Sequence, residues 1–221
     1  MTETMAPAEL DFAVGETVSI RIEEDASPIV RLISRTLGDS ASAGHALGAL
    51  QTLKAVVALH SHDTPQAAII AFGAGVIEVS SGLDAEPDAT ITVDLNARFA
   101  PVGDQVGADG VICAVLQALT PPLPDWREAA ASFWCAGRSL RGIPDRLIAI
   151  AADSDGGIET LVLGEGDSQY VIAGPSEILA GIFTGADDLI AVLYSGAIGI
   201  RGTLSQLSVM TGVSWKVRYD A

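Results

Sequence analysis

The second half of this 221-residue chain partly repeats its first half. Residues 107–119 read GADGVICAVLQAL and residues 185–198 read GADDLIAVLYSGAI, so each copy places Gly-Ala-Asp before an apolar helical run. Three short apolar runs precede each of these segments: AAIIAFG, VIEVSSG and DATITVDL in the first copy, and RLIAIAAD, GIETLVLG and SQYVIAG in the second. Two related units of roughly a hundred residues, a common domain size, account for the length and the spacing. The sequence therefore predicts a duplicated architecture.

The composition supplies ample material for a core, much of it small. Hydrophobic residues make up 49% of the chain and mean hydropathy is +0.40, whereas aromatic residues are only 5%. No apolar run approaches the roughly 18–20 residues of a membrane span, and residues 1–16 lack the pattern of a secretory signal. The two cysteines, Cys113 and Cys135, form no recognisable disulfide framework. We therefore expect a cytoplasmic protein without stable membrane insertion.

The charge of the chain is strongly negative. Twenty-eight acidic against twelve basic residues give a formal net charge of −16 at pH 7. Phosphate backbones and anionic lipid surfaces repel such a chain, so we expect no nucleic-acid partner. The charge either keeps an alanine-rich chain soluble or recruits a basic protein partner, and a homo-oligomer is also left open. Two lysines and abundant alanine favour a bacterial source with a GC-rich genome.

Hydrophobic periodicity assigns the elements of the first half. Residues 18–23 alternate apolar and polar side chains, as a half-buried strand does, and Ser27-Pro28 is a typical helix start. Gly-Ala-Gly at 73–75 is typical of a hairpin connection. The expected elements are a strand at 18–23, a helix from 28 that ends at 38–40, a helix at 44–60, strands at 66–73, 76–81 and 89–95, and a helix at 110–119.

A proline cluster separates this half from the next. The prolines of TPPLPDW at 120–126 cannot continue a helix, which favours a domain boundary there. Thr184 and Thr203 each begin a sequence with capping-box spacing, and Gly212 is expected to end the last helix. The predicted domains are an N-terminal arm with one strand at 1–26, a first unit at 27–124 and a second unit at 125–221. The second unit is expected to have helices at 125–137, 176–183, 184–196 and 203–212, and strands at 146–152, 157–163, 168–173, 197–202 and 213–219.

The second half resembles the sterol carrier protein type 2 family. The clearest stretch is YVIAGPSEILAGIFTGADDLIAVLYSGAIGIRGTLSQLSVM at 170–210, and its most distinctive element is the short strand between Gly196 and Gly202. In the first half TPPLPDW stands where this strand would follow, so the second copy is better matched. The resemblance implies an α+β fold of two tandem units, each a small, mostly antiparallel sheet covered by helices.

The resemblance also implies an apolar pocket for a lipid, a sterol-like molecule or an acyl ligand in the C-terminal unit. We therefore expect non-catalytic binding or transfer of a hydrophobic small molecule, with no cofactor and no metal. The alternative is a scaffold protein in which the same side chains form a solid core and the acidic surface recruits a partner. The candidate ligand-binding residues are Ile178, Ile182, Phe183, Ile190, Leu193, Tyr194, Ile198, Leu207, Met210 and Trp215.

No set of residues in the sequence makes a convincing catalytic site. The string His60-Ser-His62-Asp63 is similar to the metal-binding string of metallo-β-lactamase-like hydrolases, but it lacks the further histidine, and only His45 stands elsewhere. A polar helix end explains it better, with histidine near the negative end of the helix dipole. Cys135, beside two aromatic residues, is expected to be buried. An enzyme of lipid or polyketide metabolism would need a nucleophile or base that the sequence does not indicate.

Overall fold

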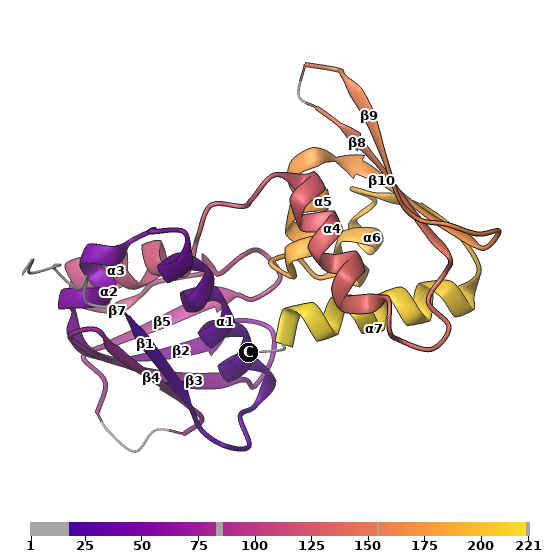
Figure 1. Ribbon diagram of the computed structural model, residues 1–221. Helices are drawn as coiled ribbons and strands as arrows, with labels where there is room; N and C mark the ends of the chain where they lie inside the picture. Colours follow the sequence, from indigo (N-terminus) through magenta and orange to yellow (C-terminus); the bar gives the residue numbers. More distant parts are fainter. Residues whose placement is uncertain (1–17, 83–85, 154, 220–221) are drawn as a thin grey trace, which may run out of the picture.

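The computed structural model describes residues 18–82, 86–153 and 155–219. It has a mixed α+β fold in which two separate sheets are each covered by helices (Figure 1). One apolar core contains buried side chains between Ala26 and Leu119, and a second contains those between Trp126 and Val213. We call the described parts of 18–119 the N-terminal lobe and those of 126–219 the C-terminal lobe. No helix in the described ranges is long and apolar enough to cross a membrane.

The N-terminal lobe is a mostly antiparallel sheet with helices over its inner face. Its strands are β1 (Ser19–Ile22), β2 (Lys54–Ser61), β3 (Ala67–Gly73), β4 (Val76–Ser80), β5 (Ala89–Asp94), β6 (Ala100–Pro101) and β7 (Val106–Gly107), and its helices are α1 (Pro28–Ser42), α2 (Leu47–Thr52) and α3 (Asp109–Ala118). The strand order is β1-β4-β3-β2-β5-β6, and β7 also pairs with β5. Ala89, Ile91 and Val93 of β5 are buried and alternate with half-buried residues, which places the core on one face of the sheet.

The C-terminal lobe is a smaller sheet that is also covered by helices. Its strands are β8 (Arg146–Ala152), β9 (Ile158–Gly164), β10 (Gln169–Pro175) and β11 (Gly199–Arg201), and its helices are α4 (Trp126–Gly137), α5 (Ser176–Thr184), α6 (Leu189–Ser195) and α7 (Leu204–Tyr219). The strand order is β11-β10-β8-β9. Leu147, Ala149 and Ala151 of β8 are fully buried against the helices. In Figure 1 the hairpin of β8 and β9 extends away from the helices, and α7 runs back toward the N-terminal lobe.

The two sheets share a pairing pattern. In the first, β2 pairs antiparallel with β3 and parallel with β5, and antiparallel β6 and β7 lie beyond β5. In the second, β8 pairs antiparallel with β9 and parallel with β10, and antiparallel β11 lies beyond β10. The counterpart of β8 is therefore β2, so the alignment of AAIIAFG with RLIAIAAD is wrong by one strand. β4 is an additional strand of the first sheet, and β1 pairs with it in parallel.

The helix expected at 44–60 is wrong. α2 ends at Thr52 and residues 54–61 form β2, which lies between β3 and β5. A strand with partners on both sides satisfies its backbone donors and acceptors in the sheet, and its two faces can both be apolar, so its sequence loses the alternation of a half-buried strand. His60 therefore lies on a strand, and the string that it begins is not a helix end.

The strand expected at 213–219 is also wrong, because α7 continues past Gly212 to Tyr219. Its buried side chains, Met210, Val213, Ser214 and Arg218, have the spacing of one helix face. The alternation of apolar and polar residues in VSWKVRY fits a strand as well as this helix face, so the sequence alone does not decide between them. The last turn of α7 reaches the N-terminal lobe, where Tyr219 packs against the first core.

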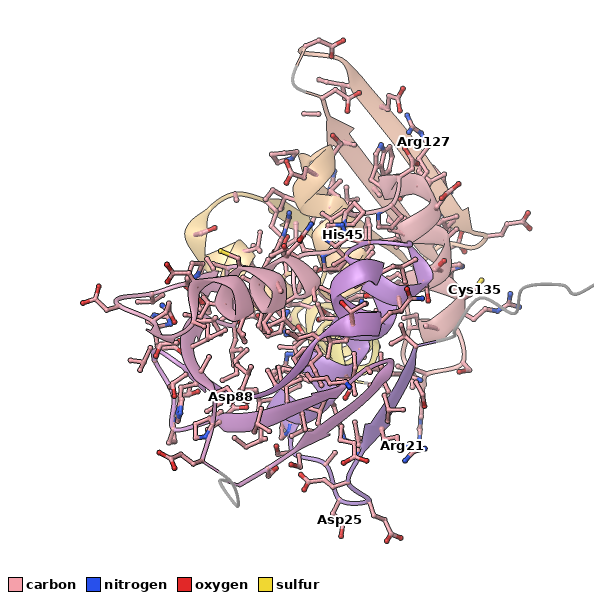
Figure 2. All side chains as sticks on the ribbon, turned by 90° about the vertical axis from the view of Figure 1, so that its left-hand side faces the viewer. Arg21, Asp25, His45, Asp88, Arg127 and Cys135 are labelled. Atoms are coloured by element: carbon pink, nitrogen blue, oxygen red, sulfur yellow. The ribbon has the colours of Figure 1, made fainter. Side chains whose placement is uncertain are left out.

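Three local predictions have mixed outcomes. The capping box before α7 is confirmed, since Thr203 N donates to Gln206 Oε1 (2.8 Å) and Gln206 N to Thr203 Oγ1 (3.1 Å). The cap of α6 is Asp188 rather than Thr184, because Asp188 Oδ1 accepts from the N–H groups of residues 190 and 191 at 2.9 Å. Cys135 is exposed on α4, contrary to the expectation of burial (Figure 2).

Candidate functional site

A cleft with a volume of about 1130 Å³ lies between the two lobes. α1 and the turn at 98–99 form its N-terminal side, α4, α5 and the following loop form its C-terminal side, and α7 contributes Val217. The walls are mainly apolar. The apolar side chains that line it are Leu32, Ala43, Phe99, Leu119, Pro121, Pro122, Leu123, Pro124, Ala129, Phe133, Ala136, Phe183, Ala186 and Val217.

The proline-rich segment at 120–126 forms one wall of this cleft. Pro121, Pro122 and Pro124 line it, and their rings fix the backbone φ angle, so the wall is stiff. Asp125 then caps α4, since its Oδ1 accepts a hydrogen bond from Arg127 N at 2.9 Å. The segment expected to be a boundary therefore also positions α4 against the cleft.

Arg98 joins the lobes at one end of the cleft. Its Nε and Nη2 donate to the two carboxylate oxygens of Asp187 at 2.9 and 2.6 Å, and its Nη1 donates to Glu177 Oε1 at 2.9 Å. Arg98 and Phe99 both have positive φ angles (50° and 60°), a strained conformation that directs this turn across the junction. Its hydrogen bonds to Asp187 raise the pKa of Arg98 against its partial burial. Two carboxylates thus face one positive charge, which leaves one negative charge in excess at this end of the cleft.

Arg218 crosses the same junction from the end of α7. Its side chain is buried, with 1% of the residue exposed, and it donates to three backbone oxygens: Leu95 O (2.6 Å), Gly185 O (2.8 Å) and Ala186 O (2.9 Å). Gly185 has φ +75°, and a Cβ there would lie 2.8 Å from Arg218 Cα. Glycine is therefore required at 185 both by the backbone and by this close approach.

Arg35 and Asp39 form the charged part of the α1 wall. They lie one helical turn apart, with Arg35 Nη2 2.9 Å from Asp39 Oδ2. Burial lowers the pKa of Arg35 against the opposing effect of Asp39, and the positive charge of Arg218 lowers it further. Burial likewise raises the pKa of Asp39, against the effect of Arg35. Charge at this end of the cleft is therefore incompletely solvated.

The ten residues expected to bind ligand occupy three environments. Buried in the second core are Ile182, Phe183, Ile198 and Met210; half-buried are Ile178, Ile190, Leu193 and Leu207; exposed are Tyr194 (87%) and Trp215 (53%). Among these ten, Phe183 is the one that lines the cleft, where its ring lies 5.2 Å from that of Phe133 between centroids. Trp215 lies on helix α7, not on a strand, and its Nε1 donates to Asp188 Oδ2 at 3.2 Å.

Sequence reasoning missed Arg35, Arg98 and the proline wall as cleft residues. The three proline positions were visible, but the sequence did not indicate what they would face. Arg98 lies in an irregular segment, and its partners are about eighty to ninety positions away in the chain. The histidine string does not join the cleft: Ser61 Oγ donates to Asp63 Oδ1 at 2.7 Å, and His62 Nδ1 is 3.8 Å from the same oxygen. In the described ranges no three metal-binding side chains come together.

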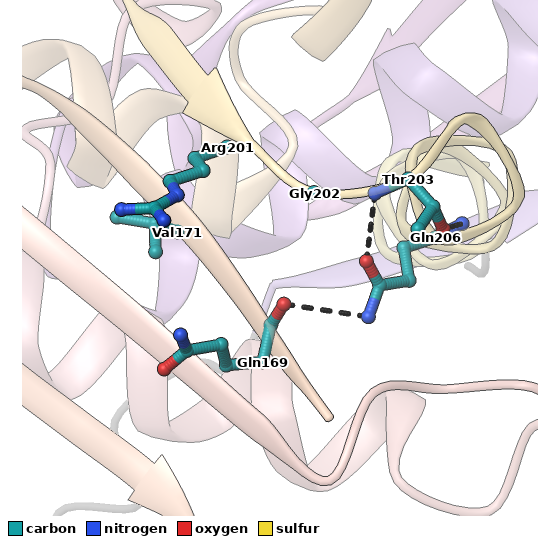
Figure 3. Close-up of a pocket in the computed structure, with 6 residues that line it drawn as sticks. All are labelled: Gln169, Val171, Arg201, Gly202, Thr203 and Gln206. Atoms are coloured by element: carbon teal, nitrogen blue, oxygen red, sulfur yellow. Dashed lines mark hydrogen bonds between the residues drawn. The ribbon is translucent and has the colours of Figure 1, made fainter. Parts of the chain in front are cut away.

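A second, smaller pocket of about 360 Å³ lies where β10 and β11 meet the start of α7 (Figure 3). Gln206 is the residue that closes it, because its amide accepts from Thr203 N and donates to Gln169 O at 3.3 Å. The same amide donates to Ser168 Oγ at 3.0 Å. The polar atoms of Gln206 are thus engaged in joining α7 to the sheet, which is a structural role.

Tyr170 lies between the pocket residues Gln169 and Val171 in β10, and its hydroxyl gives a first prediction. The side chain is buried, its ring contacts Gly202, and its hydroxyl has no hydrogen-bond partner in the described part of the chain. Tyr170→Phe is expected to raise the free energy of unfolding by about 1–2 kcal/mol at pH 7, because it removes a buried unsatisfied polar group. Urea denaturation measures this change, and Tyr194→Phe, at an exposed position, is the matched control.

The same substitution has a pH signature. Burial raises the pKa of Tyr170 from 10.0 to about 12, so the unfolded chain ionises first as the pH rises above 10. The folded state then holds more protons than the unfolded one, and stability falls with rising pH between 10 and 12. Tyr170→Phe should remove this part of the alkaline loss. An unchanged alkaline profile, or a destabilised variant at pH 7, would contradict the assignment.

Comparisons with known proteins place few constraints on this chain. No family model matches the sequence, and no curated protein matches it. Structural neighbours include sterol carrier protein 2 from Yarrowia lipolytica in its apo form, with 13% identity, a TM-score of 0.29, and coverage of 43% of this chain and 79% of the other. A conserved hypothetical protein from Thermus thermophilus, for which a sterol carrier role has been suggested, gives 12% identity, a TM-score of 0.20, and coverage of 93% and 94%. Likenesses this loose transfer no function, so any function must follow from this chain's own residues.

Proposed function

We propose that this protein binds a hydrophobic small molecule, without catalysis, in the cleft between its lobes. The observation that carries the proposal is a cleft of about 1130 Å³ with mostly apolar walls and a few charged side chains at its edge. Ligand sites in proteins are typically concave, a few hundred to about 1000 Å³ in volume, and apolar with a small number of polar groups. An apolar body would contact Leu32, Phe99 and Phe133, and the charged side chains would fix its orientation.

This proposal moves the site from the interior of the C-terminal lobe to the junction of the lobes. Phe183 belongs to both locations, since it is part of the second core and lines the cleft. A pocket opened among Ile178, Ile182 and the other expected residues would be an extension of the cleft through Phe183. We further propose that the chain consists of tandem units at 27–124 and 125–221 after an arm at 1–26, because the two sheets share their pairing pattern.

A bulky side chain in the cleft tests the proposal. Ser132 and Ala131 are neighbours on α4, both exposed, and only Ser132 lines the cleft. Ser132→Trp is expected to weaken ligand binding by at least about tenfold, or about 1.4 kcal/mol, because the indole takes up the space of the ligand. Ala131→Trp is the matched control and should bind as the unsubstituted protein does.

The measurement is the melting temperature during titration with 1-decanol, a neutral single-chain probe, and with decanoate, its carboxylate analogue. A ligand at a hundred times its Kd adds about 2.7 kcal/mol of stability, a shift of roughly 5–10 °C for a chain of this size. No shift with either probe would contradict the proposal. Equal weakening by both tryptophan variants would contradict the location in the cleft.

The alternative function is that of a scaffold. The observation that favours it is the open face of the second sheet, where Ile158 is 73% and Val162 50% exposed beside half-buried apolar residues of β8 and β10. Such a face is typical of a protein interaction surface. The titration separates the two functions, because a scaffold has no reason to respond to a single-chain amphiphile.

A further inference from the structure

The second sheet ends at β9 in an open edge. β9 has seven residues and pairs with β8 on one side, with no strand on its other side. The other edge strands of the two sheets are shorter, with four residues in β1, two each in β6 and β7, and three in β11. Figure 1 shows β9 on a hairpin that extends away from the helices. Among the described strands, β9 therefore has the longest open edge.

The backbone groups on the open side of β9 include those of Ile158, Thr160 and Val162. At the tip of the hairpin, Asp153 N donates to Gly157 O at 2.9 Å. Hydrogen-bonded pairs alternate along an antiparallel ladder, so the even-numbered residues of β9 direct their N–H and C=O groups away from β8. In the described part of the chain these groups have no hydrogen-bond partner. Such a row of unpaired groups is a template for a further strand.

The outer face of this edge strand carries no charge. Ile158 is 73% and Val162 50% exposed, and both lie on that face together with Thr160. Charged side chains and prolines commonly keep an edge strand from pairing, and β9 has neither on its outer face. The one charged residue of β9, Glu159, forms an ion pair with Arg127 on the face that the helices cover. The edge is thus neutral, apolar and unprotected.

The hairpin tip beyond this edge is acidic. Asp153 and Asp155 lie there, and within the described ranges neither forms an ion pair. Arg127, on the helix that contacts β9, is already paired with Asp125 and Glu159. Two negative charges at the tip therefore have no cationic partner.

The opposite end of the edge is acidic as well. Glu165 and Asp167 are exposed in the turn after β9. Asp145 lies beside this turn, since a Cβ at Gly166 would be 2.6 Å from the Cβ of Asp145. Arg146, the first residue of β8, brings one positive charge to this end. Among the groups of β8, β9 and this turn, three carboxylates thus face a single guanidinium.

The charge at the two ends decides which strand this edge fits. If a second copy of the chain paired antiparallel through its own β9, the acidic tip of each copy would lie against the acidic turn of the other. Like charges in such positions oppose association, and each copy has a formal net charge of −16. An extended segment with basic residues on both sides of an uncharged stretch would instead bring opposite charges together.

We propose that β9 is a docking edge for an extended segment of a partner protein, in which basic residues flank a short apolar stretch. The segment adds a strand to the second sheet: the open backbone groups of β9 supply hydrogen bonds, and Ile158 and Val162 contact its apolar side chains. The acidic tip and turn bind its basic ends and so set its register. No residue of β9 lines the cleft, so this edge and the ligand site are separate.

The test uses a synthetic peptide of alternating valine and threonine with two lysines at each end. Its counterpart has glutamates in place of the lysines, and fluorescence anisotropy of the labelled peptides measures both Kd values. The lysine peptide is expected to bind at least about tenfold more tightly at low ionic strength, because its ends meet carboxylates. Added salt should reduce this difference, since it screens the exposed charges.

Neutralising the two ends tests the role of charge. Asp155→Asn combined with Glu165→Gln should weaken binding of the lysine peptide several-fold at low ionic strength. Glu24→Gln combined with Asp25→Asn is the matched control, because both residues are exposed on the N-terminal lobe (Figure 2 labels Asp25). This control should leave the Kd of the lysine peptide unchanged.

Thr160→Pro tests the edge itself. The N–H of Thr160 points away from β8, so proline leaves the pairing with β8 intact and removes a donor on the open side. The lysine peptide should then bind at least about tenfold more weakly, whereas Thr160→Val, which keeps the N–H, should bind it as the unsubstituted protein does. If Thr160→Pro does not fold, Thr160→Lys places a charge on the edge and should also weaken binding, by repulsion of the lysine peptide.

Binding of neither peptide, or equal binding of both, would overturn the proposal. Binding of the lysine peptide that survives the substitutions at Thr160 would overturn the location at β9. Sedimentation of the protein alone gives a further check. A dimer that Thr160→Pro abolishes would assign the edge to a second copy of the chain and would also overturn the proposal.

Discussion

Replacing Arg218 with methionine is expected to lower the free energy of unfolding by about 3–5 kcal/mol, a large effect for a single substitution. Arg218 donates to one carbonyl of the N-terminal lobe and two of the C-terminal lobe, so its loss leaves buried acceptors in both. Each unsatisfied buried group costs about 1–3 kcal/mol. Methionine has a similar length, so little of the loss would come from an empty space.

Urea denaturation followed by circular dichroism measures this loss. The three acceptors belong to Leu95, Gly185 and Ala186, so Arg218→Met should also weaken the cooperation of the lobes and broaden or divide the unfolding transition. Arg138→Met, at an exposed position where α4 ends, is the control and should change stability by less than about 0.5 kcal/mol. A loss below about 1 kcal/mol for Arg218→Met would mean that solvent readily replaces its contacts.

Gly181→Ala is expected to destabilise the protein by about 2–4 kcal/mol, although alanine favours helices over glycine. Gly181 is buried in α5, and a Cβ there would overlap the carboxylate of Asp187 and lie 2.8 Å from Arg98 Nη2. The added methyl group would therefore force apart the ion pair that joins the lobes. Helix propensity alone gives the opposite sign, by about 1 kcal/mol.

Gly212→Ala is the matched control for Gly181→Ala. Gly212 lies inside α7 with no atom within 4 Å of the position of a Cβ, so this substitution should stabilise the protein by up to about 1 kcal/mol. Thermal or urea denaturation of the two variants in parallel gives the comparison. If both substitutions stabilise the protein, the close approach of Gly181 to the Arg98–Asp187 pair is not a constraint on the fold.

The sequence predicted helices and strands correctly where a single local pattern, such as an apolar run or a capping box, indicated one kind of element. The strands β4, β5 and β8 were found because each is a short apolar run, and the start of α7 because Thr203 and Gln206 have capping-box spacing. β2 was missed because a central strand can be apolar on both faces, which resembles a buried helix. The end of α7 was missed because the apolar residues of VSWKVRY fit the two-residue period of a strand as well as the 3.6-residue period of a helix.

The candidate site was largely out of reach of sequence reasoning. The cleft combines α1, the turn at 98–99, the segment 119–124 and α5, which only the packing of two lobes brings together. The expected apolar site included Phe183, which lines one wall of the cleft, because the apolar helix that carries it was recognisable in the sequence. Arg35 has the helical spacing of an ordinary i, i+4 pair with Asp39, and nothing in the sequence shows that this pair is partly buried.

The course of α7 also bears on how the protein is made. Tyr219, in the last turn of this helix, packs against the first core, and Arg218 binds the carbonyl of Leu95. Domains generally fold in order as the ribosome synthesises them. Here the nascent N-terminal lobe lacks these partners until residues 204–219 have left the exit tunnel, so its final packing waits for the synthesis of α7. A chain interrupted before α7 would accordingly leave the carbonyl of Leu95 and the surface beneath Tyr219 uncovered on the N-terminal lobe.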